Sequence, residues 1–168
     1  KLAAIPDRGA PVTTEETTAE ITSEITEAVK RLRGGDRAGG RQALEAVWAR
    51  IADDPDPVHE CVLAHHMADA QDDLAEELAW DLRALDAALR CTVVDWGLDQ
   101  KGLSIALFMP SLQVNLAEDY FKLGDLARSR EHLASARGCV DALADDAYGQ
   151  LIRRGIERLA RQLDAAGA

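Results

Sequence analysis

The segment 115–125, NLAEDYFKLGD, places apolar side chains at helical spacing directly before a Gly-Asp pair. Leu116 and Ala117 lie four and three residues before Tyr120, which is the spacing of one helix face. Gly124 can adopt the left-handed conformation that ends a helix, and Asp125 can cap the next one. Beyond the turn, small and apolar residues continue the spacing at Ser129, Leu133 and Ala136. The segment therefore predicts two antiparallel helices joined by a tight turn.

Helical spacing of apolar residues covers most of the chain from residue 17 onwards. Four breaks interrupt it, namely GGD at 34–36, DDPDP at 53–57, QDD at 71–73 and the Gly124-Asp125 turn. Gly and Pro end helices and Asp caps them, so each break predicts a connection between two helices. We expect a loop or a fraying helix end at Cys91–Gln100, and a helix over 101–123 that Pro110 either kinks or divides.

Two further apolar stripes are expected to face the core. One lies in the helix predicted after residue 73 and consists of Leu74, Leu78, Leu82, Leu85 and Leu89. The other lies in the last predicted helix and consists of Tyr148, Leu151, Ile152, Ile156, Leu159 and Leu163. Arginines and a glutamate occupy the opposite side of this last helix, which predicts one buried and one solvated face.

Composition supports an all-α chain and limits its partners. Apolar residues make up 47% of the sequence and aromatic residues only 4%, with Ala and Leu, both strong helix formers, supplying the excess. The 30 acidic and 19 basic residues give a formal net charge of −11. A surface this acidic repels phosphate groups, so we expect no binding to nucleic acid or to anionic membranes. Basic peptides or proteins are the favoured partners, and a role of the charge in solubility alone is the alternative.

Cysteine usage bears on localisation. Cys61, Cys91 and Cys139 are odd in number and widely spaced, so they offer neither a disulfide framework nor a CxxC site. We expect buried, reduced thiols and therefore a cytoplasmic protein. No apolar run approaches the roughly 20 residues that cross a bilayer. Residues 1–16 are predicted to be a disordered leader, native or vector-derived, and residues 17–168 to be one helical domain.

The segment Pro110–Leu143 resembles one repeat of the tetratricopeptide (TPR) family, in which helix pairs recur about every 34 residues. A weaker copy covers Ile21–Asp54 and a degenerate copy covers about Cys61–Leu89. The overall pattern also resembles a group of actinobacterial TPR-like proteins of unassigned function. The resemblance implies an all-α fold, a right-handed superhelix of about three TPR-like antiparallel helix pairs plus a C-terminal capping helix. An ordinary helical bundle is the alternative.

The resemblance also implies where a partner binds, because the first helix of each repeat lines the concave face of the stack. It places the following partner-binding residues there: His65, His66, Asp69, Asp72, Asp73, Asn115, Glu118, Phe121 and Lys122. Ser111 and Arg33 are expected beside them, and the groove is net acidic. Its carboxylates would bind the charges of a basic or amphipathic peptide, with Phe121 as an apolar contact. The alternative is that these residues form solvated helix faces.

The segment His59–Asp73, HECVLAHHMADAQDD, invites a chemical interpretation. His65 lies four residues before Asp69, while His66 lies three before Asp69 and seven before Asp73, so all four could share a helix face. Imidazole and carboxylate groups suit zinc or a similar ion, but the spacing is not that of HExxH. We expect no metal ion. A metal- or ligand-sensing domain built on these four residues is one alternative, and a pH response of the histidines is another.

No sequence motif indicates catalysis. No Gly-rich loop follows a strand, no G-x-S-x-G elbow is present, and no cysteine lies in an activating context. We therefore expect no enzyme activity, no catalytic residue and no cofactor. The sequence favours a protein–protein interaction scaffold or adaptor that binds a basic or amphipathic peptide in the acidic groove. A structural homodimerisation module is the remaining alternative.

Overall fold

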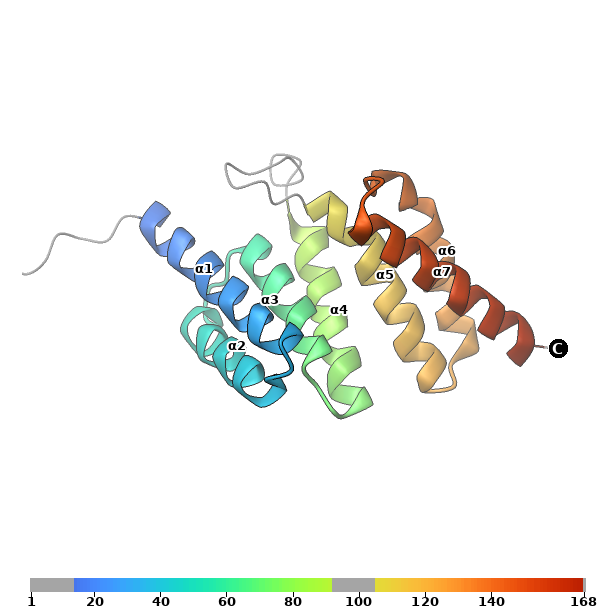
Figure 1. Cartoon of the computed structure of the whole chain (residues 1–168), viewed down its shortest axis with the longest axis horizontal. Helices are drawn as coiled ribbons and strands as arrows, with labels where there is room; N and C mark the ends of the chain where they lie inside the picture. The colour runs from blue at the N-terminus through green and yellow to red at the C-terminus, as the bar shows by residue number, and fades with distance from the viewer. Residues whose placement is uncertain (1–13, 92–104, 168) are drawn as a thin grey trace, which may run out of the picture.

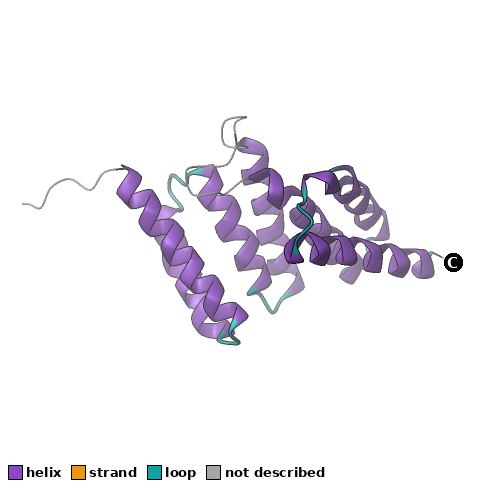
Figure 2. Ribbon diagram, turned by 45° about the horizontal axis from the view of Figure 1, so that its top comes forward, coloured by secondary structure: helices purple, strands orange, loops and turns teal. Residues whose placement is uncertain are grey.

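The part of the chain that the structure describes is helical. The computed structural model describes residues 14–91 and 105–167. In chain order these residues form α1 (Thr14–Arg33), α2 (Arg37–Ile51), α3 (Pro57–Asp69), α4 (Leu74–Arg90), α5 (Ile105–Lys122), α6 (Leu126–Gly138), the 3-10 helix η1 (Val140–Ala142) and α7 (Ala147–Ala166). Figure 2 shows only helices and loops among the described residues, with no strand, and short connections within the ranges 14–91 and 105–167. The predicted all-α class is confirmed.

Helices that follow one another in sequence pack as neighbours. The most extensive pairs are α1 with α2, α3 with α4, and α5 with α6. Helix α4 also packs against α5, and α7 lies against both α5 and α6. Figure 1 shows the helices succeeding one another along the long axis, from α1 and α2 at one end to α6 and α7 at the other.

Two of the turns use the same glycine and aspartate chemistry. Gly35 and Gly124 have φ angles of 91° and 81°, which residues with a Cβ rarely adopt. The following residue, Asp36 or Asp125, begins the next helix by accepting a hydrogen bond from the backbone N–H three residues later. The predicted helix breaks are confirmed at both positions. The turn between α3 and α4 has no glycine, and there Asp73 caps α4.

Three apolar clusters join successive helices. The first holds α1, α2 and α3 together around the fully buried Leu44 and Leu63. The second joins α3, α4 and α5 through small side chains such as Ala64 and Ala84. The third joins α5, α6 and α7 around Leu159. Each fully buried leucine contributes about 1.5–3 kcal/mol of transfer free energy, so every cluster fixes its helices in place.

The leucine stripe predicted for α4 is not the buried face of that helix. The buried residues of α4 are Asp81, Ala84, Ala87 and Ala88. Leu82 and Leu89, by contrast, are 41% and 64% exposed. Alanines permit α3 and α4 to approach closely, and leucines at the same positions would hold the two helices apart. The prediction that all five leucines of α4 face the core is therefore wrong.

Some helix boundaries also differ from the sequence prediction. Helix α1 begins at Thr14, inside the predicted leader. The sequence prediction placed this start too late, because the first turn of α1 is polar and shows no apolar periodicity. Helix α6 ends at Gly138 rather than at Leu143, and η1 follows it. The leader prediction for residues 1–13 and the loop prediction for residues 92–100 fall outside the described residues. Pro110 lies inside α5 rather than at its first turn.

None of the three cysteines, all of which lie in the described part of the chain, forms a disulfide. Cys61 and Cys91 are buried, as predicted, whereas Cys139 is only half-buried. Burial raises the pKa of the Cys61 thiol to about 12, so this thiol stays protonated and unreactive at neutral pH.

Candidate functional site

A cleft of about 540 Å³ opens on the side of the molecule formed by α1, α3, α5 and α7. Helices α3 and α5 supply half of the lining residues, the α6–α7 connection and the start of α7 supply most of the others, and α1 supplies Arg33. The lining consists of Arg33, His65, His66, Asp69, Leu107, Phe108, Ser111, Asn115, Leu143, Ala144, Asp146, Tyr148, Leu151 and Ile152. Its charged residues are one arginine and two aspartates, so the cleft has a formal charge of −1 when its histidines are neutral.

Large apolar side chains are exposed in this cleft. Leu107 of α5 is 37% exposed, and Tyr148 and Leu151 of α7 are 40% and 58% exposed. The Tyr148 hydroxyl donates a hydrogen bond to the Ser111 hydroxyl oxygen at 3.0 Å, which links α7 to α5. Apolar side chains that gather in one exposed place, unlike single ones, indicate a binding surface.

Helix α3 presents two histidines and an aspartate to the cleft. Its first turn is fixed by Pro57 and by Asp56, whose side chain accepts hydrogen bonds from two backbone N–H groups. This start places His65, His66 and Asp69 in the last two turns of α3. Because residues three and four apart share a helix face, Asp69 lies close to both histidines.

The three side chains form a compact cluster. One possible ligand atom from each of His65, His66 and Asp69 lies within 4.8 Å of the other two. Nδ1 of His66 is 3.8 Å from Oδ2 of Asp69. Burial lowers the pKa of His66, so its imidazole is neutral at pH 7. Burial favours a higher pKa for Asp69, but its interactions with His66, His65 and Arg33 outweigh this effect and lower the pKa. Asp69 is therefore ionised.

A polar network continues from His65 into the interior. His65 is only 8% exposed, and its Nδ1 faces Oδ1 of Asp81 at 3.8 Å. This distance is too long for a hydrogen bond, so the buried Nδ1 has no hydrogen-bond partner. Asn115 Nδ2 donates to the same Asp81 oxygen at 3.4 Å. Asp81 of α4 thus faces both His65 of α3, in the cleft wall, and Asn115 of α5.

Asp81 and Asp119 form a buried carboxyl pair between α4 and α5. Each is 1% exposed, and burial raises the pKa of both. For Asp119, the negative charges of Asp81 and Glu77 add to burial and raise the pKa to about 8. A carboxyl group with a pKa of about 8 is mostly protonated at pH 7, so Asp119 is neutral there. Lys122 is the nearest cation, with Nζ 3.5 Å from Oδ1 of Asp119.

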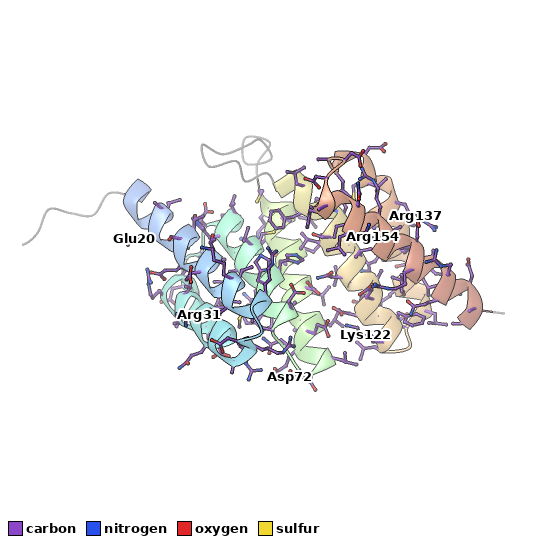
Figure 3. All side chains as sticks on the ribbon, in the orientation of Figure 1. Glu20, Arg31, Asp72, Lys122, Arg137 and Arg154 are labelled. Carbon is purple, nitrogen blue, oxygen red and sulfur yellow. The ribbon has the colours of Figure 1, made fainter. Side chains whose placement is uncertain are left out.

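The structure brings together four of the predicted partner-binding residues in the cleft, namely His65, His66, Asp69 and Asn115. The others lie outside its lining: Asp72, Asp73, Glu118, Phe121 and Lys122. Asp72 and Lys122 form ion pairs with Arg37 and Glu77, and Figure 3 shows them at the α3–α4 turn and the end of α5. Glu118 pairs with Arg158 of α7, Asp73 caps α4, and Phe121 packs against the third apolar cluster.

Sequence reasoning missed the contribution of α7 to the cleft. Tyr148 and Leu151 were expected to face the core together with Ile152. A helical wheel contains the relevant signal, because successive residues are about 100° apart and Leu151 therefore lies well off the face of Ile152 and Ile156. Ile152 and Ile156 are buried, whereas Leu151 is mostly exposed.

Comparison of the chain with protein-family models, with curated proteins and with solved structures gives no match. Among the described helices, none combines the length and the apolar character that crossing a membrane requires.

Proposed function

We propose that the chain is a protein-interaction adaptor of TPR-like architecture. Its cleft binds a peptide segment of a partner protein, and this segment carries both a basic and an apolar side chain. The observation behind the proposal is that exposed Leu107, Tyr148 and Leu151 line the same cleft as the carboxylate of Asp69. Apolar anchors and an accessible negative charge together suit an amphipathic basic segment.

The packing of the helices supports the TPR-like part of the proposal. In a superhelix of helix pairs, one helix of each pair faces the concave side, and the cleft is lined by α1, α3 and α5, each the first of its pair. At the α5–α6 crossing, Ser129 is fully buried and its hydroxyl donates to the carbonyl oxygen of Ala117 at 2.6 Å. A small residue at this place lets the two helices approach closely, as the TPR resemblance implies.

Electrostatics supports the choice of a basic partner. The side chain of Asp69 is 57% exposed, so it can contact a ligand cation from the cleft wall. The chain as a whole carries a formal charge of −11, which attracts basic segments from a distance and repels acidic ones. Binding is therefore expected to weaken as the salt concentration rises.

Selection from a random peptide library tests the proposal. The full chain serves as bait in the presence of a metal chelator, and enriched peptides are expected to carry Lys or Arg near Leu, Ile, Met or Phe. Affinity for one selected peptide is then measured by fluorescence polarisation. Leu151→Ser should weaken binding at least about tenfold, because it removes an apolar contact at the site. Leu89→Ser is the matched control, since Leu89 is similarly exposed but lies on α4 outside the cleft.

A second pair of variants tests the charge argument. Asp69→Lys should abolish binding of the basic peptide, whereas Asp72→Lys should leave it nearly unchanged because Asp72 lies outside the cleft. Enrichment of acidic peptides would contradict the charge argument. If the control variants Leu89→Ser and Asp72→Lys lost as much peptide affinity as the two cleft variants, the binding site would lie outside the cleft. A native dimer that dissociates in the Leu151→Ser variant would mean that a second copy of the chain occupies the cleft.

A further inference from the structure

We propose that His65, His66 and Asp69 bind a divalent transition-metal ion of the zinc class, and that Asp81 is the positioning residue for His65. The site lies on the α3 side of the cleft. The site is present without a partner, because the three donors belong to one helix. A bound ion occupies the carboxylate of Asp69, so the metal ion and the cation of a basic peptide compete for it.

The donor geometry is close to what a metal ion requires. The ligand atoms of the three side chains lie within 4.8 Å of one another. Tetrahedral zinc, with bonds of about 2.0–2.1 Å, separates its ligand atoms by about 3.4 Å. Small side-chain rotations close this difference, and the side chains of His66 and Asp69 reach the open cleft, where they are 14% and 57% exposed. Imidazole nitrogen and carboxylate oxygen are both ligands that zinc accepts.

The environment of His65 provides an independent argument. A metal-bound histidine usually donates its second ring N–H to a carboxylate, which fixes the tautomer and the orientation of the ring. Asp81 is placed to supply such a carboxylate, because its Oδ1 lies 3.8 Å from the buried Nδ1 of His65, which has no other partner. With the proton on Nδ1, the lone pair of Nε2 is available to a metal ion. Asn115 donates to the same carboxylate and holds it in place.

The charges around the cluster also suit a metal ion. The nearby cation, Arg33, is exposed at the end of α1, and the carboxylates of Asp69 and Asp81 oppose its repulsion of the ion. Three protein ligands leave a fourth coordination position, which faces the cleft and can take water or a donor atom of a partner.

Zinc titration of the metal-stripped full chain, in competition with a chromophoric chelator at pH 7.5, tests the site. We expect one zinc ion per chain. Asp69→Asn and His66→Gln should each lower the affinity at least about tenfold. Asp72→Asn and His132→Gln are the matched controls and should leave the affinity unchanged, because both residues lie outside the cluster. The absorption spectrum of bound cobalt(II) should likewise be lost in Asp69→Asn and kept in Asp72→Asn.

Asp81→Asn tests the positioning role. It should lower zinc affinity about 10–100-fold, as loss of a carboxylate behind a ligating histidine does. The melting temperature of the metal-free variant should not fall, because the substitution removes a buried negative charge, whereas a general disruption of the fold would lower it. Unchanged affinity in Asp81→Asn would overturn the positioning role. Absence of stoichiometric zinc, or equal affinity in cluster and control variants, would overturn the site.

Discussion

Replacing Asp119 by asparagine is expected to stabilise the folded chain, increasingly so as the pH rises. Asp119 is 1% exposed in α5 beside the equally buried Asp81 of α4. Burial, followed by the negative charges of Asp81 and Glu77, raises its pKa from 3.8 to about 8. Asparagine is neutral at every pH and has nearly the same shape, so the substitution removes the charge without opening a cavity. Lys122 loses one partner but keeps its 2.7 Å ion pair with Glu77.

The sign of the pH dependence follows from proton uptake. Between pH 3.8 and about 8, the unfolded chain has an ionised Asp119 and the folded chain a protonated one. The folded state therefore binds the extra proton, and the stability of the native chain falls as the pH rises through this window. One proton changes the free energy of unfolding by about 1.4 kcal/mol per pH unit. From about pH 4 to pH 7, this one group removes about 4 kcal/mol of stability.

Urea unfolding followed by circular dichroism, at several pH values from about 4 to 8 and in a metal chelator, measures this effect. The free energy of unfolding of Asp119→Asn minus that of the native chain should grow by about 4 kcal/mol between pH 4 and pH 7. Asp72→Asn is the control, because the side chain of Asp72 is 76% exposed and its ion pair is worth little. Parallel stability curves for the Asp119 variant and the native chain would refute the buried proton.

Two further substitutions test the packing. Gly149→Ala should destabilise the chain by about 1–3 kcal/mol, because a Cβ would lie 2.0 Å from the backbone oxygen of Ala144, whereas Gly138→Ala meets open space and should raise the melting temperature slightly. Ser129→Ala should cost about 1 kcal/mol in urea unfolding, because it removes a buried hydrogen bond to the Ala117 carbonyl, and a neutral result would contradict the role given to that bond.

Local chemistry made the helices and two of the turns predictable. A left-handed glycine followed by a capping aspartate is encoded by adjacent residues, so Gly35-Asp36 and Gly124-Asp125 could be read directly from the sequence. The clustering of His65 with Asp69 was predictable for the same reason, because four residues make one helical turn. Contacts of this kind depend on a single helix or a single turn.

Pairings between distant segments were not predictable in this way. Glu118 was expected to face a ligand, but Arg158, 40 residues later, forms an ion pair with it. The sequence shows only that an acidic residue lies on α5, and which cation approaches it depends on how α7 packs. The same limit applies to the cleft, since Leu151 reaches it only because α7 lies against α5.

The sequence of α4 contains a signal for its buried charge. The leucine spacing predicts one buried face, but the structure buries another. Asp81, Ala84 and Ala88, which follow one another at intervals of three and four, belong to the buried face. Alanines at this spacing predict a close helix contact, because only small side chains fit there. A carboxylate in such a row is enclosed by the neighbouring helix and must find a polar partner inside the protein. His65, Asn115 and Asp119 are these partners, so the polar network behind the cleft follows from the close packing of α4.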